Sequence, residues 1–156
     1  MIHLKFETTV RAPADEVWRR VSTMQGVNHE LHPWLRMSYP AQKADLKQSD
    51  FPQSGFAFSS WLLLFGLLPI DRHHLGFDRI LPDSGFDERS HSWTQKLWCH
   101  HRRVVATPRG TCITDELEFV PRLSFMAPLL RAVVAATFRH RHRRLAENFG
   151  RIHIET

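Results

Sequence analysis

The chain has 156 residues and a mass of 18.3 kDa, and 42% of its residues are hydrophobic. A chain of this length buries roughly 70% of the surface that its unfolded form exposes, which excludes a disordered protein and a small disulfide-dependent fold. Lysine and arginine exceed the acids by 21 to 16, a formal net charge of +5. Nucleic-acid binding would also need a focused basic patch with base-reading residues beside it. We therefore do not expect nucleic acid as a partner.

The chain shows neither a membrane span nor a targeting segment. No stretch reaches the roughly 20 apolar residues that cross a bilayer, and the first ten residues alternate polar and apolar side chains, unlike a signal peptide. No linker or repeat divides the sequence. Cys99 and Cys112 fit reduced thiols, because the strand register proposed below separates them by about 20 Å. We expect residues 1–156 to form a single cytoplasmic domain, as a monomer or a homodimer.

The first half of the chain predicts one strand and two short helices. Residues 2–11 alternate in the manner of a β-strand. The segment Ala12-Pro13-Ala14-Asp15-Glu16 predicts a helix start, because proline suits the first turn and acids suit its positive end. A second short helix is expected over 25–32. The stretch 35–58 is irregular, with one strand near 36–39.

The second half predicts four antiparallel strands and then a long helix. The strands cover 75–81, 86–92, 97–106 and 111–120, and turn-like sequences join the first two and the last two. After Pro121 the apolar period changes to that of a helix ending near Gly150. The residues of this helical stripe are Leu130, Val134, Phe138, Arg141, Leu145 and Phe149. These elements predict an α+β fold in which a curved antiparallel sheet wraps around a long C-terminal helix.

Three features of the sequence resemble the SRPBCC superfamily, which includes START lipid-transfer domains, polyketide cyclases and the pollen-allergen fold. They are the element order β-α-α-β-β-β-β-β-β-α, the helix start Ala-Pro-Ala-Asp-Glu-Val-Trp at 12–18, and Trp98-x-His100 followed by Gly110-Thr111-x-x-x-Asp115. The resemblance covers nearly the whole chain. It implies the helix-grip fold, with two short helices after the first strand and a cavity for an apolar ligand between sheet and C-terminal helix.

The last two predicted strands indicate which side chains face the cavity. If 107–110 is a turn, Arg102 lies opposite Asp115 on the face that also carries the apolar residues of both strands. The opposite face, with Arg103 and Glu116, is too charged to be core. The inward face is therefore the one that contains the even-numbered residues from Trp98 to Val104.

The other turns extend this pattern into a charged row. If 82–85 is a four-residue connection, Arg79 lies opposite Glu88. Pairing Ser92 with Trp98 then places Glu88 opposite Arg102 on the next strand. The predicted row across four strands is Arg79, Glu88, Arg102 and Asp115. Two interpretations stay open: a charge ladder at the open end of the sheet, or a polar band that orients a ligand in the cavity.

The segment from Trp61 to Ile70 is the most unusual local feature, because nearly all of its residues are apolar. One interpretation is a buried strand or a short core helix. The other is a rim or lid of the cavity, bent at Gly66 and Pro69, that meets ligand, a membrane surface or a second subunit.

Familiar catalytic signatures are missing from the sequence. It contains no phosphate-binding glycine loop, no Gly-x-Ser-x-Gly elbow and no zinc-ligand spacing among its eleven histidines. We expect no metal and no cofactor. His100 faces inward beside Ser90 in the predicted register, so it is the candidate general base if the protein is an enzyme.

Three functions follow as hypotheses. The leading one is binding or carriage of a hydrophobic small molecule, a lipid or an aromatic polyketide-like compound, without catalysis. The second is a polyketide cyclase-like or dehydratase-like enzyme. The third is a membrane- or partner-docking module, with peripheral membrane contact. The residues predicted to line the ligand site are Phe77, Arg79, Glu88, Ser90, Trp98, His100, Arg102, Asp115, Leu117, Phe119, Val134 and Phe138.

Overall fold

The computed structural model describes residues 1–45 and 55–152. Its strands form one antiparallel sheet in the order β1-β7-β6-β5-β4-β3-β2. The strands are β1 (Ile2–Val10), β2 (Leu35–Met37), β3 (Gly55–Leu64), β4 (Leu68–Leu81), β5 (Gly85–Ser92), β6 (Gln95–Thr107) and β7 (Gly110–Pro121). The α-helices are α1 (Ala14–Val21), α2 (Met24–Leu31) and α3 (Ala127–Phe149), and one-turn 3-10 helices cover Ala41–Lys43 and Ser124–Met126.

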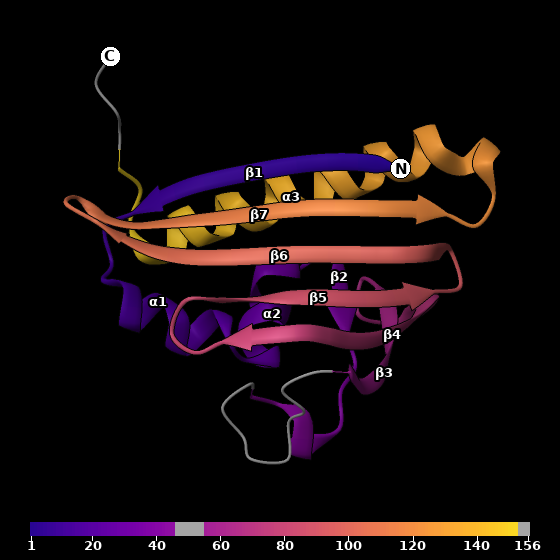
Figure 1. The fold of residues 1–156 in the computed structure, drawn as a ribbon, viewed down its shortest axis with the longest axis horizontal. Helices are drawn as coiled ribbons and strands as arrows, with labels where there is room; N and C mark the ends of the chain where they lie inside the picture. Colours follow the sequence, from indigo (N-terminus) through magenta and orange to yellow (C-terminus); the bar gives the residue numbers. More distant parts are fainter. Residues whose placement is uncertain (46–54, 153–156) are drawn as a thin grey trace.

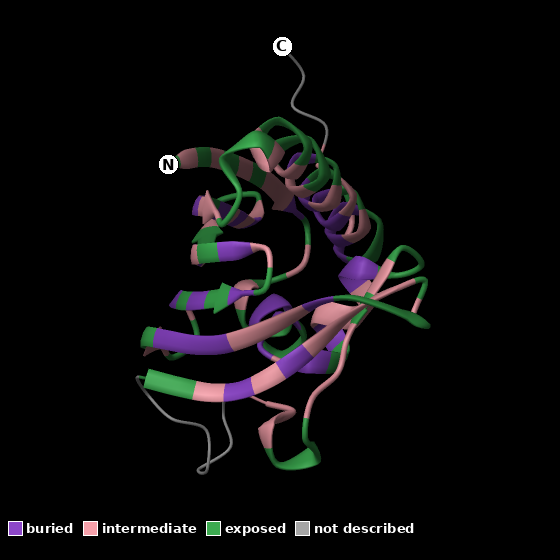
Figure 2. Ribbon diagram, turned by 90° about the vertical axis from the view of Figure 1, so that its right-hand side faces the viewer, coloured by how far each residue is buried: buried purple, intermediate pink, exposed green. Residues whose placement is uncertain are grey.

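The sheet and the long helix form two layers. Figure 1 shows α3 running behind the strands, and the view in Figure 2 shows the curved sheet on one side of the helix. Helix α1 contacts β6 and β7, whereas α2 contacts α3 and β2. The two short helices thus lie between the ends of the curved sheet and the long helix. This arrangement confirms the predicted α+β helix-grip fold.

Local sequence explains where the helices begin and end. Pro13 precedes α1, which buries Val17, Trp18 and Val21. At the start of α2 the Thr23 hydroxyl accepts a hydrogen bond from the backbone N–H of Gly26 at 3.0 Å, a helix N-cap. Helix α3 ends at Phe149 and is followed by Gly150, whose φ of 85° lies in the left-handed region that favours glycine.

The register of β6 and β7 is as predicted, but the registers on either side differ. Arg102 pairs with Asp115, as expected from the turn at 107–110. Between β5 and β6, however, Glu88 lies opposite His100, two residues away from the predicted alignment. Between β4 and β5, a bulge follows Phe77, so that Arg79 pairs with Asp87 instead of Glu88. The predicted charged row across four strands is therefore wrong.

A carboxylate from an earlier strand explains the register of β5 and β6. The Asp71 side chain accepts hydrogen bonds from the Ser92 hydroxyl, the Trp93 backbone N–H and the Thr94 hydroxyl. The Ser92 hydroxyl in turn accepts from the backbone N–H of Gln95 at 3.1 Å. These contacts close the β5–β6 connection more tightly than predicted. Asp71 lies far away in the sequence, so no local pattern revealed its part in the turn.

The apolar segment from Trp61 to Ile70 forms the tip of the β3–β4 hairpin. Strand β3 ends at Leu64, and the turn uses Phe65 and Gly66, both with positive φ. Leu67 at this tip is 85% exposed. Buried-strand and core-helix interpretations are therefore wrong for the tip. The predictions also missed most of β3 and the first half of β4.

The core divides into a large cluster and a small one. The large cluster joins α1 and α2 to the sheet and to the end of α3, and includes Trp18, Ile113 and Leu145. The small one holds Leu117, Phe119 and Phe138. None of the helices in the described ranges is both long and apolar enough to cross a membrane.

Candidate ligand-binding cavity

A cavity of about 580 Å³ lies between the concave face of the sheet, α2 and α3. Its volume falls within the range typical of small-molecule sites. The walls are mostly apolar and are formed by side chains of the sheet, α2 and α3. They include Met24, Val27, Leu31, Met37, Leu62, Leu64, Leu75, Phe77, Phe86, Trp98, Leu130, Val134 and Phe138.

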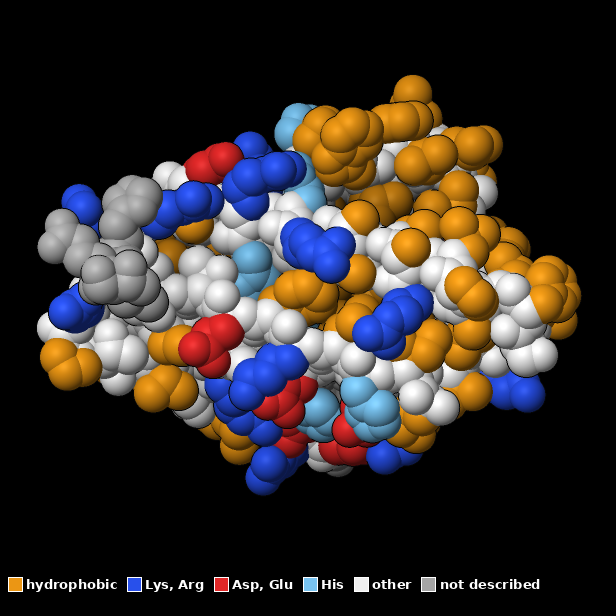
Figure 3. Space-filling model, turned by 90° about the horizontal axis from the view of Figure 1, so that it is seen from above, with side chains coloured by type: hydrophobic (Ala, Val, Ile, Leu, Met, Phe, Trp, Pro, Cys, Tyr) orange, Lys and Arg blue, Asp and Glu red, His pale blue; other side chains and the backbone are white. Residues whose placement is uncertain are grey.

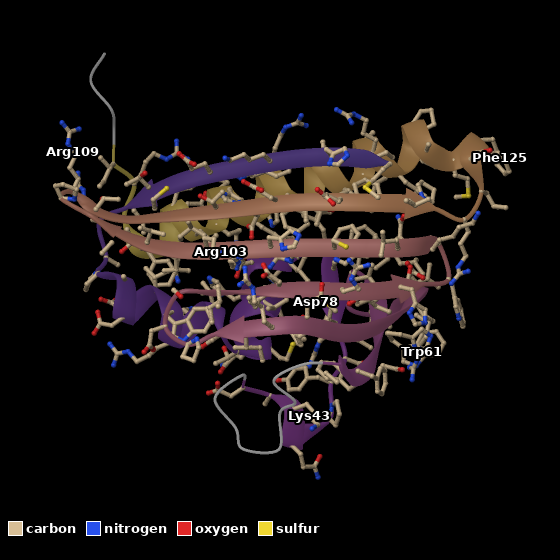
Figure 4. All side chains as sticks on the ribbon, viewed as in Figure 1. Lys43, Trp61, Asp78, Arg103, Arg109 and Phe125 are labelled. Atoms are coloured by element: carbon tan, nitrogen blue, oxygen red, sulfur yellow. The ribbon has the colours of Figure 1, made fainter. Side chains whose placement is uncertain are left out.

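Large apolar side chains stay exposed around one end of the molecule. Trp34, at 52% exposed, contacts Phe65 of the β3–β4 tip with ring centroids 6.0 Å apart. Figure 3 shows hydrophobic side chains gathered at one end, and in Figure 4 Phe125 and Arg109 mark opposite ends of the sheet. We call these exposed residues the apolar rim; they are Trp34, Phe65, Leu67, Leu68, Ile70, Trp93, Leu123, Phe125, Leu129 and Val133. The interpretation of the β3–β4 tip as a docking surface stays a prediction.

The sheet side of the cavity carries a hydrogen-bonded carboxylate. Glu88 of β5 accepts hydrogen bonds from His73 Nε2 and from the Ser90 hydroxyl, each at 2.7 Å. His100 Nδ1 lies 3.4 Å from the other oxygen of Glu88. Burial opposes ionisation of Glu88, but the contacts with His100 and His73 outweigh it and hold its pKa well below the ordinary value. Glu88 is therefore an anion in the cavity wall.

Beneath this wall lies a fully buried ion cluster centred on Arg102. Its guanidinium donates to both oxygens of Glu30, at 2.8 and 2.9 Å, and to both oxygens of Asp115, at 2.7 and 2.8 Å. Burial alone would raise the pKa of Glu30 and of Asp115, yet Arg102 holds the pKa of each carboxyl below its ordinary value. The three ions satisfy one another in two forked pairs, the geometry in which a buried salt bridge is tolerated.

Side chains of β6 and α3 also donate hydrogen bonds to the carboxylates of this cluster. His100 Nε2 donates to Asp115 at 2.7 Å, and His142 Nε2 donates to the other oxygen of Asp115 at 2.8 Å. His142 Nδ1 forms a hydrogen bond of 2.8 Å with the Thr8 hydroxyl. Arg141 Nε donates to Glu30 at 3.1 Å. The carboxylates of Glu30 and Asp115 thus link β6 and α3 to α2 and β7.

The comparisons with known proteins agree on family and fold. Residues 8–149 match the family described as Domain of unknown function (DUF8410). The chain belongs to this family. No curated protein matches the sequence.

Solved structures share the helix-grip fold of this DUF8410 chain. Protein CV1439 from Chromobacterium violaceum is 10% identical with a TM-score of 0.72, covering 94% of this chain and 96% of its own. The Zhui aromatase/cyclase from Streptomyces sp. R1128 is 15% identical with a TM-score of 0.71, covering 97% and 99%. A START superfamily protein from Mycobacterium smegmatis is 10% identical with a TM-score of 0.64, covering 94% and 96%. At these identities the likeness establishes the fold alone.

The structure brings half of the predicted site residues to the cavity surface. Those that line it are Phe77, Glu88, Trp98, His100, Val134 and Phe138. Those buried behind it are Ser90, Arg102, Asp115, Leu117 and Phe119. Arg79 lies apart from both groups, because the bulge after Phe77 leads it to an ion pair with Asp87, with 62% of its side chain exposed.

Sequence reasoning missed three residues that belong to the site: Glu30, His73 and Arg141. Glu30 and Arg141 are each less than a tenth exposed, and His73 lines the cavity beside Glu88. One signal was present, since Arg141 falls on the apolar stripe of the C-terminal helix. A cation on such a stripe implies a buried partner, and that partner, Glu30, lies in a different helix. In the described ranges, no three His, Cys, Asp or Glu side chains are grouped to hold a metal ion.

Proposed function

We propose that this DUF8410 protein binds a hydrophobic small molecule in the cavity between sheet and α3. The observation that carries the proposal is the cavity itself, about 580 Å³ with predominantly apolar walls. Binding would be driven by burial of apolar ligand surface, worth roughly 25 cal/mol per Å². In this proposal Phe77, Trp98, Val134 and Phe138 form the walls, whereas Glu88 and His100 meet a polar group of the ligand.

The buried ion cluster supports this function by fixing the walls. Arg102 connects α2 to β7 through its two forked ion pairs, and Arg141 and His142 connect α3 to the same carboxylates. An interior filled by apolar side chains would stabilise the fold without leaving a cavity. The cluster instead holds helix and sheet together at one end of the cavity, which leaves space toward the apolar rim.

The proposal is tested by filling the cavity from α3. We expect Val134→Trp to reduce the binding of an apolar fluorescent probe such as N-phenyl-1-naphthylamine at least about tenfold, since the larger side chain occupies the ligand's space. Ala132→Trp is the matched control, because Ala132 is exposed on the same helix and does not line the cavity. Equal probe binding by the two folded variants would contradict the proposal.

An acid–base enzyme is the second candidate, favoured by the pair formed by His73 and Glu88. Glu88 accepts from His73 Nε2, while His73 Nδ1 has no hydrogen-bond partner among the described residues. This is the arrangement of a general base whose tautomer a carboxylate fixes. His100, the base predicted from sequence, instead has carboxylates beside both ring nitrogens. If the protein is an enzyme, His73 is therefore better placed than His100 to accept a proton.

Proton abstraction next to a carbonyl tests this candidate. A 1,3-diketone such as benzoylacetone would lose a C–H proton to His73 Nδ1, and the enolate would regain a deuteron in heavy water. The enzyme hypothesis predicts hydrogen exchange faster than the buffer rate, lost in His73→Gln and kept in His74→Gln. The neighbouring His74 is the control, because it hydrogen-bonds Ser59 and lies outside the cavity lining. Exchange at the buffer rate would leave simple binding as the function.

A further inference from the structure

Arg141 is a buried cation that faces the cavity from α3. Its residue exposure is 7%, and it lines the cavity together with Phe138, one helical turn before it. The Arg141 guanidinium carbon lies 4.7 Å from the centroid of the Phe138 ring, and the His100 ring lies 5.2 Å from the same ring. The guanidinium and the imidazole thus border one apolar side chain of the cavity wall.

The guanidinium of Arg141 is only partly used by the protein. Nε donates to Glu30, but Nη1 and Nη2 make no hydrogen bond to any described residue. Glu30 does not require Arg141 as its partner, because Arg102 already donates to both of its oxygens at shorter distances. The two nitrogens are not completely buried, and Arg141 lines the cavity, so their N–H groups are accessible to a ligand. Two adjacent N–H groups in an apolar cavity therefore offer a site for an oxygen ligand.

The shape of the guanidinium indicates the kind of oxygen. Glu30 and Asp115 carry two negative charges, which Arg102 and Arg141 neutralise. In the same cavity wall, Glu88 is accompanied by two imidazoles, His73 and His100. The planar end of a guanidinium matches the two oxygens of a carboxylate.

We propose that the ligand is a hydrophobic carboxylic acid whose carboxylate is held by Nη1 and Nη2 of Arg141 while its hydrocarbon body fills the apolar part of the cavity. This inference rests on the proposed function and adds the chemical class of the ligand. The hydrocarbon packs against apolar wall residues such as Leu130, Val134 and Phe138.

The test compares dodecanoic acid with dodecan-1-ol, two probes with the same chain and different head groups. Isothermal titration of the intact protein is expected to give binding of the acid at least about tenfold tighter than of the alcohol, the effect of one or two charge-assisted hydrogen bonds. In Arg141→Gln this preference for the acid over the alcohol is expected to vanish. Arg139→Gln is the matched control, because Arg139 has the same charge on the same helix but is exposed and outside the cavity lining.

The outcomes separate this inference from the proposed function. If neither probe binds, the proposed function fails; if both bind equally to the native chain, only the carboxylate site is overturned. A preference that persists in a folded Arg141→Gln chain also overturns it. If that variant does not fold by circular dichroism, Arg141→Lys decides, because it keeps the cation but loses the planar fork. We expect its preference for the acid to fall several-fold, and an unchanged preference contradicts the site.

Discussion

The two ends of the cavity differ in the kind of side chain that each one buries or exposes. At the inner end, Glu30, Arg102 and Asp115 are almost completely buried, and every charged group has a charged partner at hydrogen-bond distance. At the outer end, the apolar rim exposes residues such as Phe125, at 79%, and Leu67, at 85%. Charged groups are thus buried at the inner end, and apolar side chains are exposed at the outer end.

This contrast teaches how the fold keeps a cavity open. Apolar side chains attract one another without direction, so an interior made only of them tends to close. Forked ion pairs have fixed geometry, and those of Arg102 hold α2 against the sheet at the inner end. Single hydrogen bonds from Arg141 and His142 hold α3 to the same carboxylates. The rim contributes little to this framework, because its residues bury little area. We therefore expect stability to depend on the inner end.

The largest effect should come from breaking the ion cluster. Arg102→Met leaves Glu30 and Asp115 buried without their main partner, which we expect to destabilise the fold by about 3–5 kcal/mol in urea unfolding. Arg79→Met is the control, because its pair with Asp87 is largely exposed and such pairs contribute about 0–1 kcal/mol. Similar losses of stability in the two variants would show that the buried cluster stabilises the fold no more than an exposed ion pair does.

Acid should weaken the inner end in a defined direction. The folded-state pKa of Glu30, of Glu88 and of Asp115 is below its ordinary value, so these groups stabilise the fold fully above the unfolded pKa. The ordinary pKa of glutamate is 4.5, and we expect the urea midpoint to fall as the pH drops below that value. Glu88→Gln should fall less steeply over the same range. A midpoint independent of pH in this range would contradict the ionic account.

The rim should be the most tolerant region. Phe125→Ser removes an exposed ring near the start of α3, and we expect the free energy of unfolding to change by less than about 0.5 kcal/mol. Thermal unfolding of the native chain and the variant measures this directly. A large loss would mean that the rim belongs to the core, and the contrast between the two ends would not hold.

The fold could be predicted from sequence because its signals are local. Alternation predicted the last strands, and the turn at 107–110 correctly set the β6–β7 register, including the pair Arg102–Asp115. The neighbouring registers depend on a bulge after Phe77 and on Asp71, which holds the β5–β6 turn from another strand. Such contacts connect residues far apart in sequence, so the alternation of polar and apolar residues within a strand does not predict them.

The site could be predicted only in part, for the same reason. The β-strand residues Glu88 and His100 were found because their strand faces could be assigned. Glu30 was missed because it is the partner of residues on β6 and α3, more than seventy positions away. Arg141 was placed on the apolar stripe of its helix, but its position beside the cavity required the packing of α3 against α2.

Native mass spectrometry of gently purified protein tests the central claim most directly. The cavity account predicts a population of the chain heavier than the polypeptide by the mass of one small apolar molecule, released on collisional activation and lost in the folded Val134→Trp variant. A spectrum of bare polypeptide for both proteins, unchanged after incubation with dodecanoic acid and dodecan-1-ol, would contradict it.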